Sequence, residues 1–154
     1  MGNPFGRSEI VPLTNQSGGS VAAGDVVYLD TGHDDSFTTG TTAAYTGAVG
    51  VAQQAIGAGA VGLVLTNGYA SLVNVSASVT RGHYGQTHSV AKQAADAGAS
   101  RQAGTFCQFL KGGATPDAEV WQPDLGGGSG MTNPMTTTGD LVTSSSGSTP
   151  DRIV

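Results

Sequence analysis

Short apolar runs, separated by glycine and hydroxyl residues, fill the middle of this sequence. Residues 26–30 are largely β-branched or aromatic, and apolar and polar positions alternate through residues 69–75. Runs of this length are typical of β-strands, whereas helices need longer segments with apolar positions three and four apart. The sequence predicts an all-β fold, a compact antiparallel β-barrel or sandwich, with strands at 26–30, 47–52, 62–65, 69–75, 106–110 and 119–121.

Two kinds of turn signal separate these runs. Asn67 and Gly68 lie between two apolar runs and predict a type I′ hairpin, because both central residues of that turn need positive φ. An apolar residue followed three positions later by glycine recurs from Val21, Ile56 and Val79. Each recurrence leads into apolar or aromatic residues, so we expect a tight turn that feeds a strand.

Helix is scarcely indicated. Residues 90–97 contain good helix formers and are followed by Gly98, a common helix terminator. One or two helical turns are possible here, and a loop over the end of the barrel or sandwich is an equal alternative.

The N-terminal residues 1–16 are expected to form an extended arm in front of a β body at 17–125. Pro4 and Pro12 prevent a regular helix, and a short extended apolar patch can add as an edge strand to its own sheet or to a partner's. A disordered terminus is the alternative. The apolar residues expected to make the arm's contacts are Ile10, Val11 and Leu13.

A flexible Gly/Ser linker is predicted at residues 126–130, after the body. Residues 131–154, beyond it, have too few apolar side chains to fold alone, so they need partners, most simply two identical chains.

Charge is sparse. Charged residues make up 11% of the chain, 25 residues are glycine, and no charged side chain occurs from Ser36 to Thr80. Neighbouring subunits can cover such a surface with little like-charge repulsion, or hydroxyl groups can solvate it. The net charge of −5, with scattered basic residues, argues against nucleic acid as a partner. The apolar runs are too short to span a membrane, and the absence of a signal region indicates synthesis in the cytoplasm.

Catalytic and cofactor motifs are weak. His33, Asp34 and Asp35 lie together, but their flanking glycine and threonines are typical of a turn rather than a metal site. The Gly-x-Gly-x-x-Gly pattern in residues 57–62 leads into a predicted strand, unlike a dinucleotide-binding loop. Cys107 lies in an alternating run and is expected to be a small buried hydrophobe. We predict no enzyme activity, no cofactor and no metal.

The aromatic residues allow a second interpretation. On alternating strands they are more often core residues, but together they could form a platform for sugar rings. The candidates for such a platform are Trp121, Phe106, Phe109, Tyr28 and Tyr69.

Four segments of the body, 20–30, 47–52, 56–64 and 79–84, follow one another in an order that resembles the capsid decoration and head-fibre base domains of tailed bacteriophages. In the tail, the stretch from Asn133 to Ile153 resembles a segment that introduces trimeric phage fibres, although serines at 144–146 stand where glycine is expected.

The resemblance implies a structural virion protein that binds the outer surface of a phage capsid as a homotrimer. It implies that the arm contacts the major capsid protein, that the shell is stabilised and that a head fibre is anchored by residues 131–154. It brings no catalytic residue, cofactor or metal. The alternative function is a receptor- or glycan-binding module of a tail fibre or adhesin.

Overall fold

The computed structural model describes residues 8–125, and the expected linker and fibre-like segment lie outside these residues. This part of the chain contains nine β-strands and no helix, so no helix there is available to cross a membrane. The all-β prediction is confirmed. The strands are β1 (Glu9–Asn15), β2 (Val26–Leu29), β3 (Ser36–Thr38), β4 (Val49–Ala52), β5 (Val61–Ala70), β6 (Tyr84–Thr87), β7 (Ala94–Gly98), β8 (Thr105–Phe109) and β9 (Ala118–Val120).

Five strands close into a barrel. Their order is β1-β3-β2-β4-β5, and β1 pairs with β5 to complete the ring. The β1–β3 pair is parallel and the other pairs are antiparallel. Closure leaves few exposed strand edges in this half of the molecule.

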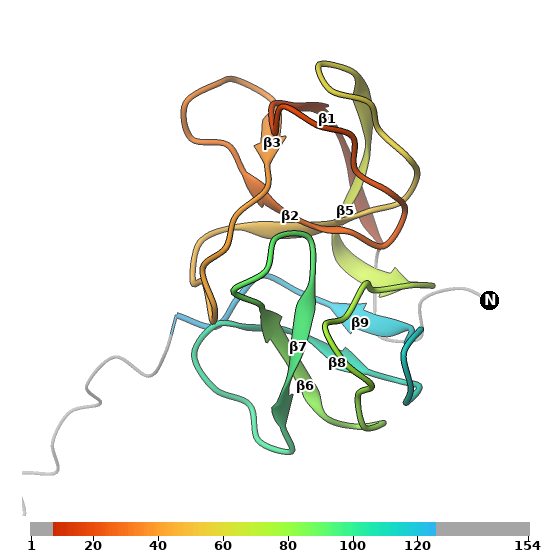
Figure 1. Ribbon diagram of the computed structural model, residues 1–154. Coiled ribbons are helices and arrows are strands. Elements are labelled where there is room, and N and C mark those ends of the chain that lie inside the picture. Colours follow the sequence, from red (N-terminus) through yellow and green to blue (C-terminus); the bar gives the residue numbers. More distant parts are fainter. Residues whose placement is uncertain (1–7, 126–154) are drawn as a thin grey trace, which may run out of the picture.

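The remaining strands extend the sheet away from the barrel. The last residues of β5 leave the barrel and pair with β9, and the order continues β9-β8-β6-β7. Figure 1 shows this second layer, green to blue, lying against the red to yellow barrel. Among the strands of residues 8–125, β5 alone belongs to both layers.

Two hydrophobic cores share the strands β2 and β4 between them. Val27 points into the barrel, whereas Val26 and Tyr28 point toward the second layer. Both faces of these strands are buried, which explains their nearly continuous apolar sequence. The barrel core contains Leu13, Val21, Val27, Phe37, Ala52, Ile56 and Val64. The intersheet core is built around Val26, Val49, Val51, Leu65, Phe106, Cys107, Phe109 and Val120.

Residues 9–15 belong to the barrel and do not form a separate arm. They form β1, which pairs with β5 over most of its length, so the chain's own sheet is the one that this segment joins. The Asn15 side-chain amide fixes the end of the strand by donating to the carbonyls of Gly19 (2.8 Å) and Ile56 (3.0 Å). Of the alternatives expected for the arm, pairing with the chain's own sheet is the one that residues 9–15 show.

The hairpin predicted at Asn67 and Gly68 is wrong. Both residues lie inside β5, which runs unbroken from Val61 to Ala70. Gly68 has φ +119°, and the strand passes there from the barrel to its pairing with β9. Glycine is needed because a Cβ at this position would lie 2.8 Å from the Cα of Ser8. The pair therefore bends a strand rather than reversing it.

Residues 94–98 form a strand, where a helical turn or a loop was expected. β7 pairs with β6 in an antiparallel hairpin, and Ala94 is fully buried in the intersheet core. Lys92 adopts φ +71° in the connection that reverses the chain. Pairing and burial outweigh the helix propensity of the alanines.

The recurring turns are confirmed. Gly24, Gly59 and Gly82 have φ of +89°, +74° and +85°. In each case the residue after the glycine donates its amide to the carbonyl three positions back, at 3.1–3.2 Å. This is the geometry of a turn that requires positive φ at its third residue, and a strand follows each turn.

Candidate interaction surface

The histidine and aspartates near residue 33 form a turn, as the sequence indicated. Asp35 adopts φ +44°, and the His33 ring lies 2.7 Å from the carboxylate of Asp30. The amide of Gly32 and then His33 hold the pKa of Asp30 below its ordinary value. Residues 8–125 contain no group of three His, Cys, Asp or Glu side chains arranged to hold a metal ion.

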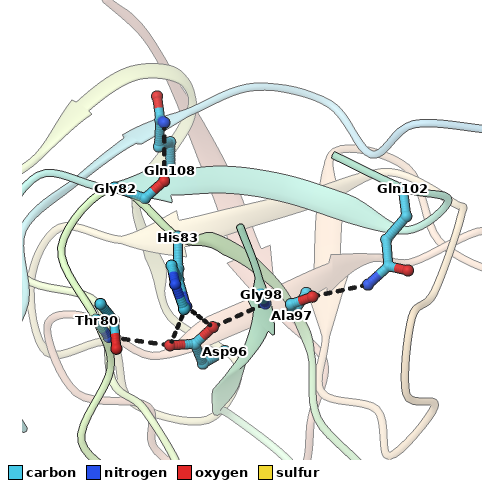
Figure 2. Close-up of polar contacts among 8 residues, drawn as sticks. All are labelled: Thr80, Gly82, His83, Asp96, Ala97, Gly98, Gln102 and Gln108. Carbon is cyan, nitrogen blue, oxygen red and sulfur yellow. Dashed lines mark hydrogen bonds and ion pairs between the residues drawn. The ribbon is translucent and has the colours of Figure 1, made fainter. Parts of the chain in front are cut away.

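A second histidine–carboxylate pair joins β7 to the turn before β6. Figure 2 shows Asp96 on β7 accepting from the amides of Thr80 (2.9 Å) and Gly98 (2.8 Å) and contacting the His83 ring at 2.8 Å. Burial raises the pKa of Asp96, but the two amides and His83 together bring it below its ordinary value. With both oxygens engaged, this carboxylate serves to fix the turn before β6.

Cys107 lies in the intersheet core, with no exposed surface. Burial raises the pKa of its thiol far above the ordinary value, and the backbone of Gly85 lowers it only in part. A nucleophile must be accessible and readily ionised, and this thiol is neither. Its role as a small buried hydrophobe is confirmed.

The structure does not assemble the aromatic platform that was considered as an alternative. Phe106, Phe109 and Tyr28 are buried in the intersheet core. Trp121 lies partly exposed on the outer side, where the Arg101 guanidinium sits 4.6 Å from the centre of its ring. The Tyr69 hydroxyl donates to Asp117 at 2.9 Å. Three of the five candidates are therefore core residues and cannot contribute to an exposed platform.

The outer side of the β1–β5 pair carries exposed apolar side chains. Pro12 lies opposite Leu63, and Thr14 lies opposite Val61, so their side chains share one face. The exposed fractions are 64% for Val61, 47% for Ile10 and 42% for Leu63. We call Ile10, Pro12, Val61 and Leu63 the β1–β5 face.

The three predicted contact residues have different positions on β1. Ile10 lies on the β1–β5 face, Val11 is half-buried and points into the barrel, and Leu13 is buried in the barrel core. Alternation along a strand makes this division unavoidable once the barrel closes. The sequence did not identify Val61 and Leu63, although their separation by Gly62 is the signal of a strand with one apolar face outward.

The barrel also contains a cavity of about 300 Å³ that reaches its surface. Apolar side chains that point inward line its floor, and Glu9, Leu29 and Asn67 at its rim are exposed. Leu29 is 46% exposed, an unusual position for a leucine at the end of a buried strand. The floor is lined by Val11, Leu13, Val27, Phe37 and Val64.

No protein-family model matches the chain, and no curated protein matches it. A solved structure does: the head fiber gp8.5 N base in bacteriophage phi29. That structure is 13% identical, the match covers 77% of this chain and 98% of that chain, and the TM-score is 0.54. The expected resemblance to a head-fibre base domain is thus confirmed at the level of the fold.

Proposed function

We propose that this chain is a structural virion protein that attaches to the outer surface of a phage capsid and forms the base of a head fibre. The observation that carries the proposal is the fold. It matches 98% of the length of a head fibre base and 77% of the length of this chain. The sequence resemblance to decoration and head-fibre base domains supports the same role independently. The proposal assigns the chain no catalytic activity.

The β1–β5 face is the surface proposed to contact the major capsid protein. Its side chains are apolar and lie on two paired strands of a closed barrel, so little conformational entropy is lost when they are covered. Contiguous exposed apolar side chains of this kind mark interaction sites on soluble proteins. Of the predicted contact residues, Ile10 remains a candidate for contact with the capsid protein, whereas Leu13 is buried in the barrel core.

Homotrimerisation through residues 131–154 completes the proposal. Three linked copies bind a shell far more tightly than one, because the second and third contacts form at high effective concentration. A modest apolar face on each copy then suffices for stable attachment and for stabilising the shell.

Sedimentation of the full chain with purified, expanded phage capsids tests the proposal. Val61→Asp places a charge on the β1–β5 face and is expected to reduce capsid occupancy by at least about tenfold. Val90→Asp is the matched control, because Val90 is also exposed (53%, against 64% for Val61) but lies before β7. If no concentration of the parent chain sediments with capsids, the function is wrong. If Val61→Asp binds like the parent, the assigned surface is wrong.

The adhesin alternative has less support. Three of its five aromatic candidates are core residues, and Trp121 is flanked by Arg101 and Tyr84.

A further inference from the structure

The wall of the barrel is incomplete beside the first half of β1. β3 has only three residues and pairs with β1 at Thr14 and Asn15. Asp35, just before β3, adopts φ +44°, so the chain turns away where a longer β3 would continue. Within residues 8–125 no strand pairs with residues 9–12 of β1 on this side.

The backbone of β1 presents hydrogen-bonding groups to this opening. Thr14 donates its amide to the carbonyl of Asp35 (2.8 Å) on the β3 side, whereas Asn15 donates to Ala60 (2.9 Å) on the β5 side. Successive residues of a strand alternate in this respect, so Ile10 and Pro12 face the same way as Thr14. Proline has no N–H, and its occurrence here is typical of an unpaired strand edge.

The cavity lies next to this free edge. Its lining includes Val11 and Leu13 from β1 and Val27 and Leu29 from β2, the two strands that a longer β3 would separate. A strand added along β1 would therefore direct alternate side chains into the cavity. About 300 Å³ is at the lower end of the range for ligand pockets, a size that suits a few aliphatic side chains.

The charge near the opening is acidic. The sequence has no lysine or arginine between Arg7 and Arg81, the whole stretch that forms the barrel. Glu9 lies on the cavity rim, and Asp34 and Asp35 lie in the exposed turn that precedes β3. A partner with basic side chains beside its apolar ones is favoured electrostatically.

We propose that the free edge of β1 and the adjoining cavity bind an extended segment of a partner protein. The segment adds as a strand in the line of β3, its backbone pairs with Ile10 and Pro12, alternate aliphatic side chains enter the cavity and flanking basic residues meet the acidic rim. A small apolar ligand fits less well, because it would leave the β1 backbone groups unpaired. This proposal does not rest on capsid attachment: it uses the backbone groups of Ile10 and Pro12, whereas the proposed capsid contact uses their outward side chains.

A synthetic peptide provides the test. We would titrate the isotope-labelled full chain with acetyl-Lys-Val-Thr-Val-Thr-Val-Lys-amide and follow the protein's amide signals by NMR. The expected result is saturable binding, shifts concentrated at residues 9–13 and Leu29, and slower hydrogen exchange of the Ile10 amide. Leu29→Glu places a charge in the cavity mouth and should weaken binding by about tenfold or more. Leu72→Glu is the matched control at another exposed leucine (36%) and should have little effect.

Three altered peptides separate the contributions of backbone pairing and of charge. Two of them are N-methylated on alternate residues, so that each peptide loses the backbone N–H donors along one of its two edges. If a strand is added, one of these two peptides should fail to bind. Replacing both lysines by glutamate should weaken binding if the acidic rim contributes.

Absence of saturable binding at millimolar peptide would overturn the proposal, as would equal binding of the parent peptide and both N-methylated peptides. Self-association of the parent chain that Leu29→Glu abolishes, without peptide binding, would overturn it in favour of a second copy as the occupant.

Discussion

Individual aspartates hold the turns of this protein together. Asp96 accepts two backbone amides, and Asp124 accepts from the Arg101 guanidinium (2.8 Å) and the Thr105 hydroxyl (2.8 Å). Arg101 lowers the pKa of Asp124, and hydrogen bonds lower that of Asp96 despite its burial. A carboxylate with a lowered folded pKa stabilises the protein above its unfolded pKa. The turns should therefore weaken in acid.

Asp96→Asn tests this at one residue. The carboxylate's contribution is fully present above an unfolded pKa near 3.8 and is lost as pH falls through the lower folded value. We expect the variant to be less stable by about 1 kcal/mol at pH 7, discounted for partial exposure, with the difference shrinking below about pH 4. Urea unfolding at pH 7, 5, 4 and 3 measures it.

Asp34→Asn is the control for Asp96→Asn, because Asp34 is exposed and its carboxylate makes no hydrogen bond within residues 8–125. A difference between parent and Asp96→Asn that stays constant from pH 7 to pH 3 would show that the charge of Asp96 is unimportant.

At the scale of elements, alternation predicted four of the nine described strands close to their observed bounds, whereas β3 (Ser36–Thr38) and β6 (Tyr84–Thr87) were not predicted. β2, β4, β8 and β9 lie where apolar runs occur, because their burial is encoded in their own side chains. The recurring glycine turns were predictable for a similar reason, since positive φ is a local requirement.

The errors arose where distant partners decide the structure. Asn67 and Gly68 carry a hairpin signal, but β1 and β9 pair with β5 on both sides of that point and keep it extended. Residues 94–98 have helix propensity, yet β6 recruits them as a strand. Local sequence does not encode pairing with distant strands, and such pairing can outweigh the local conformational preference of a segment.

The candidate surface could be predicted only in part, for the same reason. The apolar character of Ile10, Val11 and Leu13 is visible in sequence, but which of them faces outward depends on closure of β1 against β5. The opening beside β1 depends on where β3 begins, and the positive φ of Asp35, which sets that point, is only suggested by the sequence.

Gly68→Ala tests the bend in β5. The new methyl group would meet the backbone of Ser8 at 2.8 Å and would also require φ near +119°. We expect a loss of stability of about 2 kcal/mol or more, measured by urea unfolding.

Two further glycines separate the causes of that loss. Gly82 has φ +85°, but there is open space where a Cβ would lie. Gly82→Ala should therefore lower the unfolding free energy only by the strain of positive φ, about 1 kcal/mol. Gly57 also has open space where a Cβ would lie and has no positive φ, so Gly57→Ala should leave the unfolding free energy nearly unchanged. If Gly68→Ala costs no more than Gly82→Ala, close approach to Ser8 does not constrain the bend.

At the scale of the whole molecule, the two layers share their walls. β2 and β4 separate the barrel core from the intersheet core, and β5 runs through both layers. Opening the barrel would therefore expose one side of the intersheet core to solvent. The proposed role as a fibre base would use such coupling, because load on one layer would then reach the other.

Ile56→Val tests this coupling, because Ile56 is buried in the barrel core and Cys107 in the intersheet core. Removing one methylene should lower the unfolding free energy by about 1 kcal/mol. We expect the opening free energies measured by hydrogen exchange of the Val27 amide and by thiol labelling of Cys107 to decrease by the same amount. The labelling reports opening because a buried thiol reacts only after the core opens. Val90→Ala, at an exposed site, should change neither. If Val27 exchanges faster while Cys107 labelling is unchanged, the barrel opens by itself and the shared strands do not couple the layers.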